Sequence, residues 1–318
     1  MYHPYFRGKQ FDLLTIREMA PLLSKAGFIP IIEPVRDVLG GLNKALDSVV
    51  EADGRAIMIV NPYHGDLSGA PESLTEMLKS EFLDKEGISA GILLKHETSL
   101  TEALECYHQH HSHCPVFIHA GFGEAKALAD SLGSFTQDNC HVFFENHCGR
   151  LYRKHFKGAH CVLLRDGVEH VKRNRDCVPL QKFSDLHLTF EDEGMNGFGD
   201  FLIVGDDFRE GGGPAYAIAI HLTFIDSDKE DEMWIHHFLS ERQDTPKDPA
   251  GKFAEALARM MKVLDRPDSK ILETEAVQEF RKLHKDGHFP GLGHVKKLSM
   301  NHHIETLADY FGNADRLP

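Results

Sequence analysis

The sequence lacks the features that mark several classes of protein. It has no run of about 18 apolar residues, which a membrane-spanning helix needs. Its opening residues, MYHPYFRGKQ, contain no apolar stretch of the kind found in signal peptides. The six cysteines include no CxxC pair and are not spaced like a disulfide framework. We therefore expect no membrane association, a cytoplasmic location and reduced thiols.

Basic residues are outnumbered in this chain. The 35 lysines and arginines face 49 aspartates and glutamates, which gives a formal net charge of −14. Such a balance argues against broad binding to nucleic acid, whose phosphates attract basic surfaces. The one basic run, VKRNRDCVPLQK, is short, and we interpret it as a solvated loop. The sequence also contains no GxGxxG, Walker or HExxH motif, so no common nucleotide or zinc signature marks its function.

What the chain does contain is a repeated pattern over its first two-thirds. Short apolar runs end at polar residues and alternate with amphipathic segments such as DLLTIREMAPLLSKAG and SLTEALECYHQHH. A strand covered on both faces needs a continuous apolar run, and parallel strands need helices as crossovers. The runs are YHPYFRGK, FIPIIEP, RAIMIVNP, AGILLKH, PVFIHA, HVFFEN, CVLLRD and DFLIVGDD. About eight such units favour closure over an open sheet, so we predict an α/β fold of the (β/α)8 TIM-barrel type.

The pattern changes after Asp207. The segment FREGGGPAYAIAIHLTFIDSD alternates and is followed by EMWIHHFLSE, which predicts an antiparallel hairpin with an acidic turn near residues 228–231. The amphipathic segments KFAEALARMMKVLD, TEAVQEFRKLHKDG and NHHIETLADYF predict helices. We expect a barrel over residues 1–210, with a C-terminal hairpin and helices over residues 211–318 packed on it. This C-terminal region is also where we expect a protein partner to bind, if the protein has one.

Polar residues gather where the predicted strands end. In barrels of this type the carboxyl ends of the strands and their loops surround one cavity, where active sites lie. Cations at such a mouth favour an anionic ligand, most often a phosphate, and arginine adds bidentate geometry. The predicted substrate-binding residues are Arg7, Lys9, Asn61, Lys95 and Arg165, and the predicted catalytic residues are Glu33, His119, Glu145 and Asp206.

The carboxylates at this mouth have more than one interpretation. They could act as general acid and base, or they could hold a divalent metal that bridges a phosphate. In the metal arrangement, His119, Glu145 and His147 could join Glu33 or Asp206 around the metal. Alternatively, the cations and carboxylates could pair with each other in a structural network and take no part in chemistry. The cofactor is therefore left undefined, with a divalent metal as the candidate.

Other segments also have a functional and an ordinary interpretation. Lys95 could act as a Schiff-base nucleophile, but we favour anion binding because other cations accompany it. The glycines of AGFGEAKALAD and REGGGPAY follow predicted strands, where their N–H groups could hold a phosphate or simply form turns. The histidine-rich HQHHSHC precedes a strand, on the face opposite the predicted site. We interpret it as surface or helix-end residues.

The opening YHPYFRGKQFDLLTIRE, followed by IPIIEPV and a strand ending in NP, resembles the start of an uncharacterised prokaryotic group related to the "beta protein" family. The resemblance rests on the YxRGKQ and PIIEPV motifs and extends to Asn61. It implies a bacterial or phage-associated protein, often encoded in mobile or defence-like neighbourhoods, and no established reaction. The resemblance therefore supports the strand-end residues as a site without naming a substrate.

The predicted barrel and its strand-end residues favour an enzyme that acts on a phosphorylated or nucleotide-like anionic small molecule, by hydrolysis, as a phosphoester hydrolase would. The rival interpretation is a non-catalytic ligand-sensing or scaffold component of a bacterial or phage-associated defence system, because a fold does not fix a function. The enzyme needs Glu33 and Glu145. The scaffold instead needs the C-terminal hairpin and helices, including Trp234.

Overall fold

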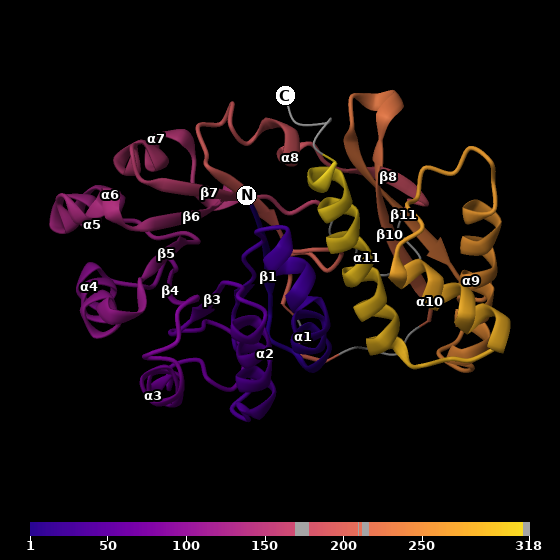
Figure 1. The fold of residues 1–318 in the computed structure, drawn as a ribbon, viewed down its shortest axis with the longest axis horizontal. Coiled ribbons are helices and arrows are strands. Elements are labelled where there is room, and N and C mark those ends of the chain that lie inside the picture. Colours follow the sequence, from indigo (N-terminus) through magenta and orange to yellow (C-terminus); the bar gives the residue numbers. More distant parts are fainter. Residues whose placement is uncertain (169–177, 209, 212–215, 314–318) are drawn as a thin grey trace. The chain divides into compact units, whose positions relative to one another are not determined.

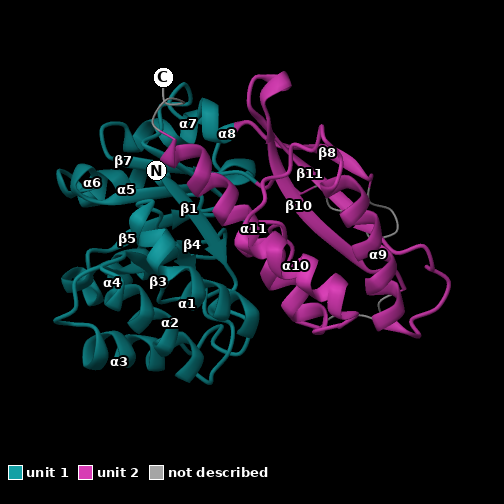
Figure 2. Cartoon of the chain, turned by 45° about the vertical axis from the view of Figure 1, so that its right-hand side comes forward, with its two compact units in different colours: residues 1–165, 186–201 teal, residues 166–185, 202–318 magenta. Residues whose placement is uncertain are grey.

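The computed structural model describes residues 1–168, 178–208, 210–211 and 216–313. The chain forms two compact units (Figure 2). The first contains residues 1–165 and 186–201, and the second contains residues 166–185 and 202–318. The units therefore do not divide at the expected boundary between residues 210 and 211, because residues 166–185 and 202–210 group with the C-terminal part. Of the basic run VKRNRDCVPLQK, only the part from Val178 onward is among the described residues.

The first unit is a closed barrel surrounded by helices (Figure 1). Among the described residues, eight parallel strands follow the order β1-β2-β3-β4-β5-β6-β7-β9. Strand β9 pairs with β7 on one side and with β1 on the other, which closes the sheet. The strands are β1 (Tyr2–Phe6), β2 (Ile31–Ile32), β3 (Ala56–Ile59), β4 (Ile88–Leu94), β5 (Val116–His119), β6 (Cys140–Phe144), β7 (His160–Leu164) and β9 (Gly197–Asp200). This topology confirms the predicted TIM-barrel-like α/β fold.

Apolar side chains fill the interior of the barrel. Alternate residues of a strand point to the same face, and the inward positions form one buried cluster that includes Tyr5, Ile31, Ile57, Ile118 and Phe144. Gly91 shows how tightly this cluster packs, since a Cβ at that position would lie 2.9 Å from the side chain of Ile57 and 3.0 Å from that of Ile118. The barrel is therefore a packed core and not a pore, and sites for ligands are expected at its ends.

Amphipathic helices connect the first strands of the barrel. They are α1 (Gln10–Lys25), α2 (Gly40–Glu51), α3 (Glu72–Glu81), α4 (Leu100–Gln109) and α5 (Ala125–Leu132). Helix α4 begins at a capping box, in which the hydroxyl of Ser99 and the carboxylate of Glu102 each accept the other residue's backbone N–H. Shorter helices α6 (Phe135–Asp138), α7 (Arg150–Arg153) and α8 (Leu186–Thr189) complete the unit.

The eighth barrel strand lies earlier in the chain than the run DFLIVGDD had indicated. Strand β9 ends at Asp200, so Asp206 and Asp207 follow it at a distance and belong to the second unit. Glycine explains why this strand has no apolar run: a Cβ at Gly197 would lie 2.6 Å from the carbonyl oxygen of Met1. Close approach of two backbones selects glycine at such a position, and hydrophobic periodicity does not detect it.

The second unit is a three-stranded antiparallel sheet with helices. Its strand order is β10-β11-β8, with β10 (Ala219–Asp226), β11 (Glu232–Leu239) and β8 (Leu180–Ser184). The predicted hairpin is confirmed: Asp226 pairs with Glu232 across the acidic turn. Helices α9 (Pro249–Leu264), α10 (Glu275–Asp286) and α11 (Leu292–Gly312) follow, and the apolar core of this unit includes Leu222, Phe253 and Phe280. None of the described helices is both long enough and apolar enough to cross a membrane.

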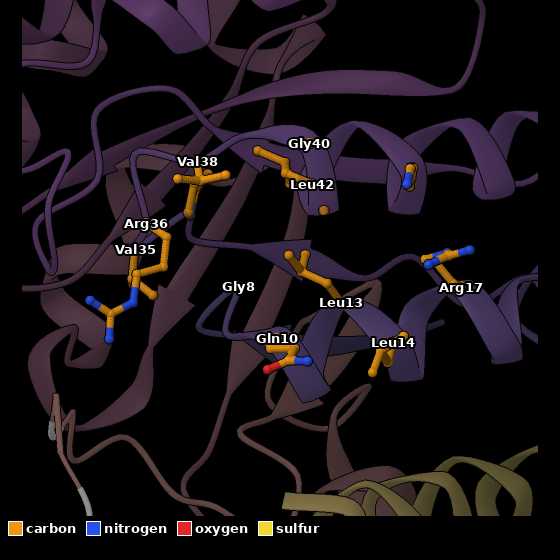
Figure 3. Close-up of a pocket in the computed structure, with 13 residues that line it drawn as sticks. Gly8, Gln10, Leu13, Leu14, Arg17, Val35, Arg36, Val38, Gly40 and Leu42 are labelled. Carbon is orange, nitrogen blue, oxygen red and sulfur yellow. The ribbon is translucent and has the colours of Figure 1, made fainter.

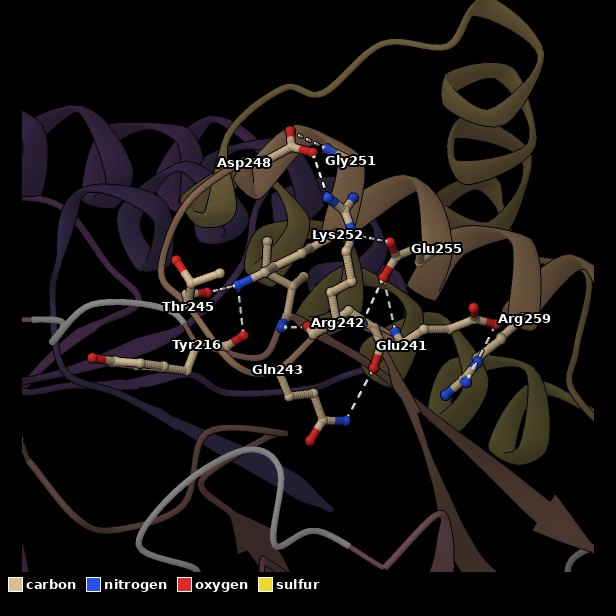
Figure 4. A network of polar contacts seen from close by, with 12 residues as sticks. Tyr216, Glu241, Arg242, Gln243, Thr245, Asp248, Gly251, Lys252, Glu255 and Arg259 are labelled. Atoms are coloured by element: carbon tan, nitrogen blue, oxygen red, sulfur yellow. Dashed lines mark hydrogen bonds and ion pairs between the residues drawn. The ribbon is translucent and has the colours of Figure 1, made fainter.

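A buried lysine on α9 holds the loop before that helix through hydrogen bonds (Figure 4). The ammonium of Lys252 is fully buried and donates to the carbonyl oxygens of Tyr216, at 2.7 Å, and Thr245. Beside it, Arg242 contacts the carboxylates of Asp248 and Glu255. A buried ammonium needs such partners because its desolvation is costly. These contacts attach the connection between β11 and α9 to the helix.

Candidate functional site

A fully buried carboxylate stands at the carboxyl end of β2. Glu33 is 0 % exposed and is surrounded by hydrogen-bond donors. The Tyr5 hydroxyl donates to Oε2 at 2.8 Å, and the guanidinium of Arg7 donates to the same oxygen. Oε1 accepts the backbone N–H groups of Tyr63 at 3.0 Å and His64 at 3.1 Å. Strands β1 and β2 and the loop after β3 therefore converge on one side chain.

These donors determine the charge of Glu33. Burial alone raises the pKa of its carboxyl, but the hydrogen bond from His64, the positive charge of Arg7 and the Tyr5 hydroxyl outweigh it and lower the pKa to about 2. The carboxylate is therefore ionised at neutral pH and is not a general acid. Its role is to hold Arg7, the ring of His64 and the loop that follows β3.

The ring of His64 is oriented by this carboxylate. Its Nδ1 lies 3.0 Å from Oε1 of Glu33 and 3.4 Å from Nη1 of Arg7. An ionised carboxylate can only accept a hydrogen bond, so the shorter contact places the proton on Nδ1 and leaves Nε2 as the accepting nitrogen of the neutral ring. His64 is half-buried. A carboxylate that fixes a histidine tautomer is the arrangement that catalytic bases use.

A cavity of about 480 Å³ lies at the loops after β3 and β4, and Tyr63, the neighbour of His64, contributes to its wall, whereas Glu33 and His64 do not. Lys95 lines it, with its ammonium 4.8 Å from the centre of the Tyr63 ring, and the Tyr63 hydroxyl donates to Glu97 at 2.9 Å. Asn61 also lines the cavity, but its amide both accepts from and donates to the backbone of Leu93. Lys95 shares this cavity with the carboxylates of Glu97, Glu102 and Glu105, whereas Asn61 holds β3 against β4.

The remaining predicted cations are held elsewhere in the barrel unit. Arg165 forms a two-pronged ion pair with Glu145, in which Nε–Oε2 is 2.7 Å and Nη2–Oε1 is 2.9 Å. Lys9 caps α1, and its backbone N–H donates to Asp12. Two predicted binding arginines are therefore paired with two predicted catalytic glutamates, Arg7 with Glu33 and Arg165 with Glu145.

His119 lies on the other face of its strand. Its neighbours Ile118 and Ala120 belong to the barrel interior, so the His119 side chain points outward, where it is 0 % exposed. There it contacts the Tyr152 hydroxyl at 2.7 Å and Nδ1 of His141 at 3.0 Å. The structure does not bring His119 together with Glu33. Strand alternation explains the difference, because one residue of shift moves a side chain to the opposite face.

Asp206 belongs to the second unit. There its backbone N–H donates to the carboxylate of Asp166 at 2.8 Å. Among the described residues no group of three or more His, Cys, Asp or Glu side chains is arranged to hold a metal. The expected combination of His119, Glu145 and His147 is therefore not gathered into a metal site.

The glycine-rich segment AGFGEAKALAD follows β5. Gly121 has a φ of +117°, and a Cβ there would lie 3.5 Å from the backbone nitrogen of His96. Glu124, the N-cap residue of the following helix α5, does not cap that helix with its side chain, and its carboxylate instead accepts the backbone N–H of Leu100 at the start of α4. In the segment REGGGPAY, Gly212 and Gly213 lie outside the described residues.

The sequence pattern did not identify Tyr63 or His64 as site residues. They lie in the long loop NPYHGDLSGAPES, two and three positions after Asn61, respectively. The available signal was the loop itself, since long loops at the carboxyl ends of barrel strands carry function. Only the folded chain shows that the Glu33 carboxylate binds this loop.

The fold and this cluster define a TIM-barrel-like α/β protein with a carboxylate–histidine dyad and a lysine-lined cavity at the carboxyl ends of β2 to β4. Comparisons with protein-family models, with curated proteins and with solved structures give no match.

Proposed function

We propose that this protein is a barrel enzyme that hydrolyses a phosphorylated or nucleotide-like anionic small molecule at the carboxyl ends of β2 to β4. The observation that carries the proposal is the dyad of Glu33 and His64, whose loop also supplies Tyr63 to the wall of the cavity that Lys95 lines. A general base must be oriented before it can act, and a buried carboxylate provides that orientation. A lysine in the same region supplies the charge that attracts a phosphate.

The residues suggest a simple division of roles. Lys95 binds the phosphate oxygens, and Nε2 of His64 accepts a proton from the attacking water. The water oxygen bonds to phosphorus as the bond from phosphorus to the leaving oxygen breaks, and the leaving oxygen keeps the electron pair of that bond and takes the proton from the His64 imidazolium. Glu33 stays ionised throughout and stabilises the imidazolium that forms, because its pKa of about 2 is far below neutral pH. Arg7 balances the charge of that carboxylate.

A ligand-sensing or scaffold role in a bacterial or phage-associated defence system is the second candidate. One observation favours it: both predicted catalytic glutamates form ion pairs with arginines. A site whose charges pair internally can bind or support without chemistry. In that case removal of the dyad would leave biological activity intact, while changes in the hairpin at Trp234 would abolish partner binding.

The test is a thermal-shift titration with sugar phosphates, mononucleotides and dinucleotides, with and without Mg²⁺, Mn²⁺ or Zn²⁺, followed by an assay of phosphate release. A ligand at a hundredfold excess over its Kd stabilises the native state by about 2.7 kcal/mol. We expect one class of compound to raise Tm, and the shift to disappear in Lys95→Gln but not in Lys126→Gln, which changes an exposed lysine on α5.

Turnover distinguishes the two candidates. His64→Gln should lower phosphate release by about a hundredfold or more, whereas His108→Gln, at an exposed histidine on α4, should leave it unchanged. A ligand that binds through Lys95 without turnover would support sensing over catalysis. If no anion binds the folded protein, the hydrolytic role and the anion-sensing role are both ruled out.

A further inference from the structure

We infer that a second ligand site lies between α1 and α2, and that it takes a small amphipathic anion, a phosphate or carboxylate attached to a short apolar body. The site is a pocket of about 360 Å³ bordered by the loops after β1 and β2 (Figure 3). A cavity of this volume falls in the range of small-molecule sites. The inference does not depend on the proposed hydrolysis, because it uses none of the residues assigned to it.

The charge of the pocket is the first argument. Among the described residues, the titratable side chains that line it are Arg17 on α1, Arg36 after β2 and Lys44 on α2, and none of these lining residues is acidic. In the described part of the chain, Arg17 and Lys44 have no carboxylate within ion-pair distance, while Arg36 lies 3.5 Å from the exposed Asp66. An acidic protein with a net charge of −14 thus leaves two cations unpaired at one pocket. Such a pocket attracts an anion.

The apolar lining is the second argument. Leu13, Leu14, Val35, Val38 and Leu42 line the same pocket, and Val38 is 79 % exposed. Figure 3 shows Leu13 between the two helices, with Arg36 at one end of the pocket and Arg17 toward the other. Contact with apolar side chains increases the affinity for a ligand that carries an apolar body. Inorganic phosphate alone would therefore leave much of the pocket unfilled.

The start of α2 adds hydrogen-bond donors to this lining. The first N–H groups of a helix have no partner within the helix. Here the N-cap residue is Leu39, no side chain caps the helix, and its first turn contains no acidic residue. Gly40, Gly41 and Leu42 of this turn line the pocket, and the two glycines leave the backbone accessible to a ligand. The donors therefore complement the cations of the same pocket.

The pocket can be tested by binding phenyl phosphate to the full chain labelled with ¹⁵N-glycine. Gly8, Gly40 and Gly41 line the pocket, so their amide signals report on it directly. Gly40→Ala identifies one of these signals, since a Cβ at that position would meet nothing within 4 Å. We expect saturable shifts in this group of signals, and phenyl phosphate to bind about tenfold more tightly than inorganic phosphate because of its ring.

Charge variants complete the test. Arg17→Gln/Lys44→Gln should weaken phenyl phosphate about tenfold or more, while Lys25→Gln/Lys79→Gln, which removes two exposed lysines away from the pocket, should leave the Kd within about twofold. Binding at these glycines should also persist in Lys95→Gln, which separates this pocket from the cavity at the barrel mouth.

Three results would overturn the inference. The first is the absence of saturable shifts at the pocket glycines, and the second is equal affinity in the Arg17→Gln/Lys44→Gln variant and in the original chain. The third is equal binding of inorganic and phenyl phosphate, which would remove the apolar part of the ligand and with it the class proposed.

Discussion

The carboxylate oxygen Oε1 of Glu33 accepts both the backbone N–H of His64 at 3.1 Å and a hydrogen bond from its ring Nδ1 at 3.0 Å. One buried atom therefore fixes the position of the loop after β3 and the orientation of the ring that this loop carries. Both contacts end on the same oxygen. A movement of the loop away from Glu33 would therefore also break the hydrogen bond from the His64 ring. The dyad and the fold around it are consequently stabilised by the same charge.

Glu33→Gln should destabilise the protein by about 3 kcal/mol at neutral pH, because Arg7 would stay buried without its carboxylate. The folded-state pKa of about 2 lies below the ordinary value of 4.5. The stabilisation is therefore complete above pH 4.5 and is lost as the pH falls toward 2. Urea unfolding across this range measures it, with the exposed Glu81→Gln as control. A difference between Glu33→Gln and the original chain that stays constant down to pH 2 would contradict the assignment.

The pair of Arg165 and Glu145 should behave as a partly exposed structural ion pair. Its side chains are 25 % and 29 % exposed, so we expect a coupling free energy of about 1 kcal/mol from a double-mutant cycle with Arg165→Met and Glu145→Gln. Screening should reduce this coupling at high salt. No coupling at low salt would show that the two-pronged geometry does not persist in solution.

The outward side chain of His119 should matter for stability and not for ligand binding. The carbonyl of Thr136 can only accept, so His141 donates to it from Nε2, His119 donates to Nδ1 of His141, and the Tyr152 hydroxyl donates to Nδ1 of His119. Tyr152→Phe leaves one buried nitrogen without a donor and should cost about 1 kcal/mol, and His119→Phe should cost about 2 kcal/mol.

The measurement for His119 combines unfolding with binding. Both variants should keep the affinity for any ligand found at the barrel mouth, and their effects on stability should be less than additive when combined, because they break the same chain of hydrogen bonds. A loss of ligand affinity in His119→Phe, with stability unchanged, would show that His119 belongs to the ligand site.

The buried histidines should make the protein sensitive to mild acid. Burial lowers the pKa of His3 to about 3, and burial also lowers those of His141 and His302 to about 4. The same groups in the unfolded chain bind protons near pH 6.5. Between pH 6.5 and 4 the unfolded state therefore binds more protons, and the free energy of unfolding falls as the pH is lowered.

Urea midpoints between pH 7 and 4 test this directly, together with the ring signals of the histidines by NMR. The three buried rings should remain neutral at pH 5.5. A midpoint that does not change between pH 6.5 and 4 would contradict the prediction.

The sequence by itself determined the barrel. Continuous apolar runs such as AIMI in β3 and GILL in β4 are typical of strands covered on both faces, and the amphipathic helices between them indicate parallel crossovers. It also determined which polar residues stand at the carboxyl ends of strands, including Glu33 and Lys95. These features follow from local composition, which periodicity detects.

Tertiary structure decided the rest. The glycine-rich strand β9 is defined by close backbone approach to β1, and β8 joins the second sheet through pairing with β11. Local sequence does not encode either partner. His119 faces away from the barrel interior because side chains alternate along a strand, and a one-residue uncertainty in register reverses the face. The partnership of Glu33 with His64 joins residues 31 positions apart, and the pairing of β2 with β3 brings them together.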